Sequence, residues 1–168
     1  MENHIAIQKY DSPCGMLLLA AYGNQLCMCD WENNPHRKLT DRKLRQFFQA
    51  EFTHTRAAII TETAKQLDEY FENKRDRFSI PLIFTGTDFQ NTVWDVLRTV
   101  PYGSTYSYQE MANIIGRKKP TRAVANAIGA NPISIIVPCH RIIGSNNTLT
   151  GYAGGLNAKQ FLLTLENA

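Results

Sequence analysis

The chain has 168 residues, of which 43% are hydrophobic and 20% are charged. This composition is typical of a globular protein and excludes a disordered, collagen-like or coiled-coil chain. At about 150 residues per domain, the length predicts one domain or two small ones. No apolar run reaches the ~20 residues of a membrane-spanning helix. The N-terminus lacks the cationic and apolar segments of a signal peptide, so we expect a cytoplasmic protein.

The formal net charge of +3 is unevenly distributed along the chain. Residues 1–80 contain 11 basic and 11 acidic residues, whereas residues 81–168 contain 7 and 4. The excess is concentrated in 101–141, where the basic residues are Arg117, Lys118, Lys119, Arg122 and Arg141. A local basic patch indicates a polyanionic partner bound on one face. A solvated cationic loop is the alternative interpretation.

Short apolar or alternating runs separated by turn signals predict three β-strands near the N-terminus. These runs lie at 5–10, 16–22 and 25–31. The polar region 32–59 has no assignable pattern, and apolar residues recur at helical spacing in 62–73. A change to charged and then extended sequence in 74–86 indicates a boundary. We therefore predict an N-terminal domain over 1–80 and a C-terminal domain over 81–168.

Four cysteines, Cys14, Cys27, Cys29 and Cys139, are present, and in a cytosolic protein we expect them to be reduced. Cys27 and Cys29 share one face of a predicted strand. Together with Cys14 and a histidine they could hold zinc, but the spacing fits no standard zinc finger. Burial in the core is the favoured interpretation, and we predict no metal.

Two capping boxes, at 87–90 and 107–110, predict the starts of two helices. The second helix is short and ends at Gly116, and Pro120 begins another. Two short helices joined by a glycine-containing turn indicate a helix-turn-helix near 107–129. Basic residues lie in its turn and at the start of its second helix, where a DNA-reading helix presents its side chains. The same motif is also a common packing unit.

The apolar run 133–137 follows an Asn131-Pro132 turn and predicts a strand that ends at Pro138-Cys139-His140-Arg141. A final helix is predicted from Asn157 to Glu166. A thiol becomes a good nucleophile as the thiolate, a neighbouring imidazole can take its proton, and a third group can orient the imidazole. Adjacent residues on a strand point to opposite sides, so this chemistry requires a turn at Pro138 or a bridging water. Cys-His pairs also occur by chance.

The Pro-Cys-His-Arg tetrapeptide resembles the active-site signature of the O6-alkylguanine-DNA alkyltransferases. Three longer segments, 86–112, 122–144 and 151–166, resemble the family's entry to its helix-turn-helix, its recognition helix with the active-site strand, and its closing loop and helix. The similarity is weaker over 1–84. The resemblance implies an α/β N-terminal domain with a small antiparallel sheet, and a mostly α-helical C-terminal domain that contains the helix-turn-helix.

The resemblance also implies direct-reversal DNA repair without a cofactor. A monomer would bind double-stranded DNA through the minor groove, flip out the alkylated guanine and transfer the alkyl group irreversibly to Cys139. Because the thioether product has no easy leaving group, we expect one transfer per molecule. Whether O4-alkylthymine is also a substrate, and which alkyl sizes are accepted, stays open. No membrane partner is expected.

Residue roles follow from the resemblance. Cys139 would be the acceptor, with His140 as its base through a water and Glu166 completing the relay. Tyr108 would donate a proton toward the departing guanine, and Asn131 would hold the turn before the active-site segment. Arg122 would fill the space of the flipped nucleotide. The other expected DNA contacts are Arg117, Lys118, Lys119, Ala123 and Arg141. The expected pocket residues are Pro138, Ser134, Thr150, Tyr152 and Ala153.

Three other functions compete with this interpretation. A damage-binding protein without the acceptor is disfavoured because position 139 is cysteine. A helix-turn-helix regulator would need a dimer surface and an effector site, and neither is evident. A Cys-His hydrolase would not account for the basic turn or for Arg122.

Overall fold

The computed structural model describes residues 3–116, 120–144 and 151–167. The chain folds into two compact units, Met1–Thr85 and Gly86–Ala168. Within the described residues, no helix is long and apolar enough to cross a membrane. The domain division after residue 80 stays a prediction.

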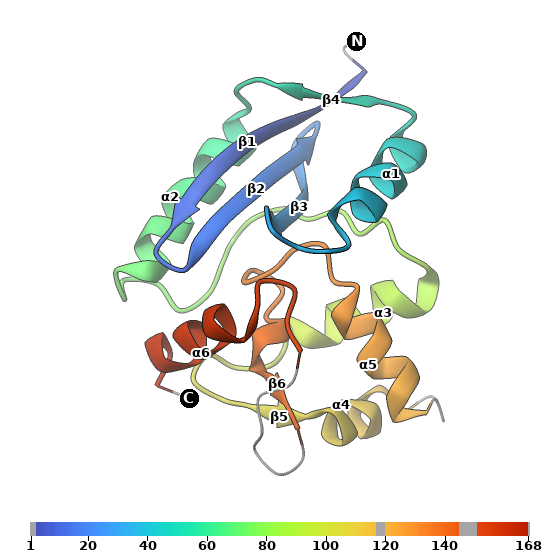
Figure 1. Ribbon diagram of the computed structural model, residues 1–168, viewed down its shortest axis with the longest axis vertical. Helices are drawn as coiled ribbons and strands as arrows, with labels where there is room; N and C mark the ends of the chain where they lie inside the picture. Colours follow the sequence, from blue (N-terminus) through green and yellow to red (C-terminus); the bar gives the residue numbers. More distant parts are fainter. Residues whose placement is uncertain (1–2, 117–119, 145–150, 168) are drawn as a thin grey trace. The chain divides into compact units, whose positions relative to one another are not determined.

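The N-terminal unit is built on a four-stranded sheet with strand order β3-β2-β1-β4 (Figure 1). The strands are β1 (His4–Ser12), β2 (Gly15–Tyr22), β3 (Gln25–Trp31) and β4 (Glu51–His54). The first three correspond to the predicted strands and pair antiparallel. The unpredicted β4 pairs parallel to β1, so the sheet is mixed. β4 has four mostly exposed residues, which leaves little apolar pattern to detect in its sequence.

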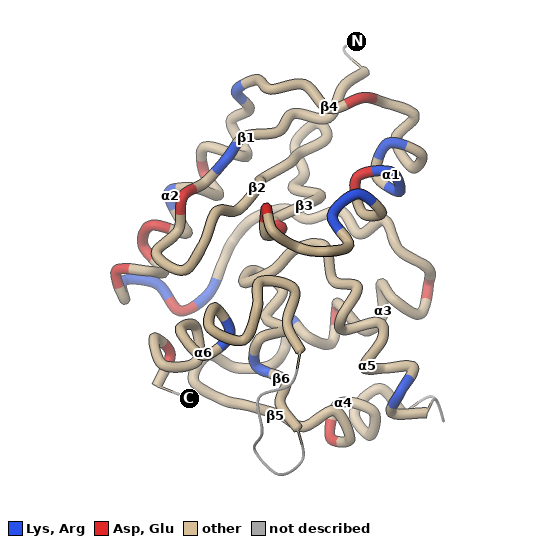
Figure 2. The backbone as a smooth tube through the Cα atoms, viewed as in Figure 1, with Lys and Arg blue, Asp and Glu red and all other residues tan. Residues whose placement is uncertain are grey.

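Two helices complete this unit, α1 (Arg37–Phe48) and α2 (Ala58–Phe71). α2 packs across β1, β2 and β3, whereas α1 packs beside β3 (Figure 1). The Phe48 ring stacks on Tyr22 of the sheet at 4.3 Å, which attaches α1 to β2. Five basic residues lie on α1 against one acidic residue, so much of the positive charge of this unit lies there (Figure 2). α1 was not predicted because its buried contribution is mainly Leu44.

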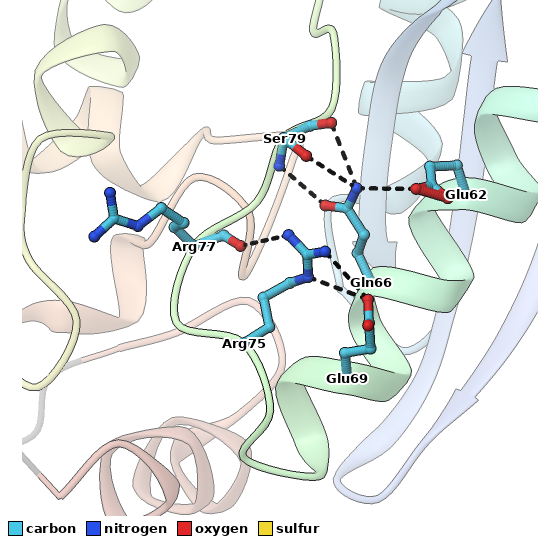
Figure 3. Close-up of polar contacts among 6 residues, drawn as sticks. All are labelled: Glu62, Gln66, Glu69, Arg75, Arg77 and Ser79. Atoms are coloured by element: carbon cyan, nitrogen blue, oxygen red, sulfur yellow. Dashed lines mark hydrogen bonds and ion pairs between the residues drawn. The ribbon is translucent and has the colours of Figure 1, made fainter.

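Side-chain hydrogen bonds attach the segment after α2 to that helix (Figure 3). The amide of Gln66 donates to Ser79 Oγ at 3.2 Å and accepts from the Ser79 backbone N–H at 3.0 Å. The guanidinium of Arg75 donates to Glu69 at 3.2 Å and to the Arg77 carbonyl at 3.1 Å. These bonds fix a segment that has no strand or helix of its own.

The C-terminal unit is mostly helical. Its elements are α3 (Asp88–Leu97), β5 (Tyr106–Ser107), α4 (Tyr108–Ile115), α5 (Thr121–Gly129), the 3₁₀ helix η1 (Cys139–Arg141), β6 (Ile142–Ile143) and α6 (Leu156–Leu165). Both predicted capping boxes are formed, at Thr87 and at Ser107. α4 and α5 pack on each other and on α3, and the Trp94 indole donates to the Ala127 carbonyl at 2.8 Å. This arrangement provides the two helices of the predicted helix-turn-helix.

The predicted strand at 133–137 is wrong, because this segment is a buried turn. The Val137 N–H donates to the Ile133 carbonyl at 3.0 Å, and Ile135 has a φ of 69°. The segment is apolar because all five residues are buried, and a short apolar run does not distinguish a strand from another buried segment. α6 begins at Leu156, one residue earlier than predicted, after Gly155 with a φ of 90°.

The packing of Gly86 against Trp94 gives a first testable prediction. A Cβ at Gly86 would lie 2.5 Å from the Trp94 ring and 2.7 Å from Gln90 Oε1. Trp94 is 3% exposed and its indole is hydrogen-bonded, so the ring cannot easily move. We expect Gly86→Ala to lower the free energy of unfolding, measured with urea, by about 1–3 kcal/mol.

The matched control is Gly129→Ala, because a Cβ at Gly129 would meet no atom within 4 Å. Its stability should be unchanged or higher by up to about 1 kcal/mol, since alanine has the better helix propensity. Equal losses in both variants would contradict the packing argument.

Candidate active site

Asn131 fixes the turn that precedes the candidate nucleophile. Its Nδ2 donates to the Val137 carbonyl at 2.9 Å and to the Ile133 carbonyl at 3.3 Å. Its Oδ1 accepts from the Ile133 N–H at 2.9 Å. The buried side chain of Asn131 therefore bonds both ends of the turn. Within this turn the β-branched Ile135 has a positive φ, which is a strained conformation that the surrounding contacts must maintain.

Cys139 and His140 lie on a tight 3₁₀ turn and not on an extended strand. The Cys139 N–H donates to the Val137 carbonyl at 2.8 Å, and the Arg141 N–H donates to the Pro138 carbonyl at 3.1 Å. The chain thus turns at Pro138, which is one of the two arrangements that would let a neighbouring thiol and imidazole communicate. Cys139 is 8% exposed and His140 is completely buried.

His140 and Arg141 converge on the carboxylate of Glu166, which follows the last residue of α6. His140 Nε2 lies 2.8 Å from Glu166 Oε2. Arg141 donates from Nε to Oε1 at 2.8 Å and from Nη2 to Oε2 at 3.1 Å. All three residues are buried, so this is a desolvated, charge-assisted network that joins η1 to α6.

The electrostatics of this network determine the tautomer of His140. Burial alone would raise the pKa of Glu166, but hydrogen bonds from His140 and Arg141 lower it to about 2. Glu166 is therefore an ionised acceptor, and His140 Nε2 must carry the hydrogen that it donates. Burial lowers the pKa of His140, against the opposing effect of Glu166, which favours the neutral imidazole. Nδ1 is consequently the unprotonated, basic nitrogen.

The prediction that Arg141 contacts DNA is wrong. Arg141 is only 6% exposed, and besides Glu166 its guanidinium donates to the Val100 carbonyl at 2.7 Å and lies 5.6 Å from the centre of the Tyr102 ring. A side chain held on all sides within the protein cannot reach a phosphate. Its hydrogen bonds instead hold the Glu166 carboxylate.

The other predicted residues lie on several elements. Tyr108 is the first residue of α4 and is half-buried. Arg122, the second residue of α5, is exposed, and Ala123 beside it is half-buried. Arg117, Lys118, Lys119 and Thr150 lie outside the described residues.

The expected pocket residues differ in their burial. Pro138 and Ser134 are buried, whereas Tyr152 and Ala153 are half-buried in the segment before α6. Ser134 Oγ has no hydrogen-bond partner within the described part of the chain.

Lys159 is a residue that the sequence reasoning missed. It lies on α6, is completely buried, and donates from Nζ to the Ile142 carbonyl at 2.6 Å. Its burial could have been predicted from its position in the predicted final helix. One face of that helix is formed, at helical spacing, by Lys159, Leu162, Leu163 and Glu166. That face is buried, so both of its charged residues are buried with it.

Cys27 and Cys29 lie on β3 of the N-terminal unit and are completely buried. Burial raises the pKa of Cys27 to about 12. In the ranges 3–116, 120–144 and 151–167, no three His, Cys, Asp or Glu side chains gather where they could hold a metal ion. These properties fit cysteines that pack in a core.

Comparison with known proteins covers both units. The family model for the 6-O-methylguanine DNA methyltransferase DNA-binding domain matches residues 88–168, and the model for the ribonuclease-like domain of the same proteins matches residues 5–84. The chain is 42% identical over 166 residues to the methylated-DNA–protein-cysteine methyltransferase of Mycobacterium tuberculosis, covering 98% of this chain and 93% of the relative. The Methanosarcina barkeri protein of the same name is 43% identical over 156 residues, with 93% of each covered.

Solved structures agree with these sequence matches. The crystal structure of Mycobacterium tuberculosis O6-methylguanine methyltransferase superposes with a TM-score of 0.81 at 40% identity, covering 97% of this chain and 93% of that one. The crystal structure of Mycobacterium tuberculosis OGT in complex with DNA gives a TM-score of 0.82 at 41% identity, with 98% and 92% covered.

The buried carboxylate gives a prediction for stability. Glu166→Gln leaves the Arg141 guanidinium without its charged partner, so we expect a loss of about 3–5 kcal/mol in the free energy of unfolding at neutral pH. The pKa of Glu166 falls from an ordinary value of 4.5 to about 2 on folding. Its contribution to stability is therefore present above pH 4.5 and lost as the pH falls toward 2.

Urea unfolding across this pH range would test the prediction. Glu166→Gln should lack this component of the acid-induced loss of stability. The control variant Glu51→Gln changes an exposed residue with an ion pair of 3.9 Å, and it should retain that component. Identical pH profiles for wild type and Glu166→Gln would be inconsistent with an ionised Glu166.

Proposed function

Because the chain belongs to the 6-O-methylguanine DNA methyltransferase family, we propose that it repairs DNA by transferring an alkyl group from O6 of guanine to Cys139. The observation that carries this proposal is that Cys139 directly precedes, on the same 3₁₀ turn, a buried His140 whose Nε2 lies 2.8 Å from Glu166 Oε2. A thiol next to an oriented base is the arrangement that generates a thiolate nucleophile.

The geometry supports a role for each group in the transfer. His140 Nδ1 is buried and has no hydrogen-bond partner among the described residues, and we assign it the Cys139 proton, passed through a bridging water. The thiolate attacks the alkyl carbon as the C–O6 bond breaks, and the bonding electrons leave with the guanine. Tyr108 donates a proton to that guanine, which makes it a better leaving group.

The product explains why we propose a stoichiometric reaction. S-alkylcysteine is a thioether, which has no easy leaving group. Removal of the alkyl group would require a second nucleophile to attack the alkyl carbon and expel the Cys139 thiolate, and no group in the proposed mechanism has that role. One molecule therefore accepts one alkyl group, and no cofactor takes part.

The helix-turn-helix supports a proposal for DNA binding. Arg122 is exposed at the start of α5, where the side chain can enter the duplex and occupy the space of a flipped nucleotide. Entry from the minor groove suits a side chain that acts as a wedge without base readout. The basic residues at 117–119 add phosphate contacts, and Tyr152 and Ala153 form the wall of the alkyl pocket. We propose that the protein binds DNA and carries out the transfer as a monomer.

Mass spectrometry would test the acceptor. After incubation with a duplex that carries one O6-methylguanine, the Cys139 peptide should gain one CH2, and the gain should saturate at one per protein. Cys139→Ser should gain nothing, whereas Cys14→Ser should behave as wild type. Tight binding without a change in mass would instead indicate a damage-binding protein.

Substitution of Arg122 would test base flipping. Extrusion of a base costs a few kcal/mol, so loss of the inserted side chain in Arg122→Ala should slow transfer from duplex DNA by about tenfold or more. Transfer from free O6-methylguanine should be unchanged, because a free base needs no extrusion. The exposed-cation control, Lys65→Ala on α2, should match wild type on both substrates. Equal slowing on both substrates would place Arg122 in the chemical step.

A further inference from the structure

The two side chains proposed to act on the flipped nucleotide lie on different helices. Tyr108 is the first residue of α4, and Arg122 is the second residue of α5. In the proposed reaction the extruded base has to reach Tyr108 while Arg122 occupies the space that the base has left. The covalent length of one nucleotide limits the distance between these two points on the DNA. The two side chains would therefore have to be held at a fixed separation when DNA binds.

The start of α4 is attached to the segment that carries Cys139. β5 directly precedes α4, and it pairs parallel with β6, which directly follows η1 (Figure 1). In this pairing Ser107 lies opposite Ile143. Ser107 is also the N-cap residue of α4 and forms its capping box. Strand pairing and capping thus position Tyr108 relative to the proposed nucleophile.

α5 is anchored differently at its two ends. Its buried residues all lie at position 124 or later. In this half of the helix, the Ala127 carbonyl accepts a hydrogen bond from the Trp94 indole at 2.8 Å. At the other end, the N-cap residue Pro120 forms no side-chain capping hydrogen bond. Because Arg122 lies in the first turn of α5, its position depends on how this N-terminal end is held.

A side-chain hydrogen bond joins the first turns of the two helices. The Thr121 hydroxyl of α5 donates to Gln109 Oε1 of α4 at 2.8 Å. The amide nitrogen of Gln109 donates in turn to Asn113 Oδ1, one turn further along α4, at 3.0 Å, so both ends of the amide are bonded. Gln109 directly follows Tyr108 in the sequence. Thr121 directly precedes Arg122, so the bond links the neighbours of the two proposed groups.

We propose that the hydrogen bond between Gln109 and Thr121 holds Arg122 in place for base extrusion. The inference rests on the proposed function for the roles of Arg122 and Tyr108. Both bonded side chains are then positioning residues, which set the separation between the inserted side chain and the proton donor. Loss of the bond would leave Tyr108 in place, because α4 has its own capping box and strand pairing, and would free the first turn of α5. Extrusion from a duplex would suffer, whereas the chemistry on a free base would not.

Transfer rates of the full-length protein on two substrates test the proposal. Thr121→Val removes the hydroxyl and keeps a β-branched side chain of similar shape. Since one hydrogen bond contributes modestly, transfer from duplex DNA should slow by about three- to tenfold, and transfer from free O6-methylguanine should be unchanged. Thr121→Ser keeps the hydroxyl and should stay near the wild-type rate. The matched control Thr61→Val removes an exposed hydroxyl that donates to the Ala57 carbonyl on α2, and it should behave as wild type.

Double variants distinguish positioning of Arg122 from a general loss of stability. When Arg122→Ala has removed the side chain to be positioned, adding Thr121→Val should cause no further slowing on duplex DNA. Adding Thr121→Val to Gln109→Met should also cause no further slowing, because Gln109→Met has already removed the bond. Further slowing in either pair, or equal slowing of Thr121→Val on duplex and free base, would overturn the proposal.

The fluorescence of a duplex with 2-aminopurine at the target position provides a readout without alkyl transfer. The emission of this base rises when it leaves the stack, so saturation with Thr121→Val should give a smaller rise than saturation with wild type. If wild type extrudes the base and transfers no methyl group, the proposed reaction is wrong, and the difference in emission still decides the role of the bond. Equal emission with Thr121→Val and with wild type would contradict that role.

Discussion

The buried carboxylate of Glu166 is the interaction on which the C-terminal unit depends. It holds His140 at 2.8 Å and Arg141 at 2.8 Å, and Arg141 extends the connection to the Val100 carbonyl after α3. Tyr102 adds a bond from its hydroxyl to the Leu165 carbonyl at 3.4 Å. One carboxylate thus joins η1, α6 and the segment after α3. Such a network stabilises the fold only when every charge in it is paired, because unpaired buried charges are costly.

This constraint also determines the tautomer of His140. An ionised Glu166 accepts a hydrogen bond from the Nε2–H of His140 and leaves Nδ1 without a hydrogen, so the ion pair with Arg141 and the tautomer that the proposed transfer requires have the same cause. On the other side of Cys139, Asn131 bonds both ends of the preceding turn. The proposed nucleophile is therefore fixed from both directions along the chain, which is the preorganisation that the proposed in-line displacement would require.

Local signals in the sequence predicted much of this fold. The capping boxes at Thr87 and Ser107 depend on residues three apart, and the three long strands have clear runs, so both were found. Burial that depends on distant parts of the chain could not be predicted from local sequence. Apolar character alone made 133–137 resemble a strand. Arg141 was interpreted as a surface cation because its partner is 25 residues away, and Lys159 was missed for the same reason.

The proposed transfer depends most directly on the protonation state of His140. Nitrogen-15 spectra of the imidazole at neutral pH would report it, with the signals assigned by comparison with His140→Gln. We expect a neutral ring with hydrogen on Nε2 and none on Nδ1. A doubly protonated ring, or hydrogen on Nδ1, would contradict it, because Nδ1 could then no longer accept the proton of Cys139.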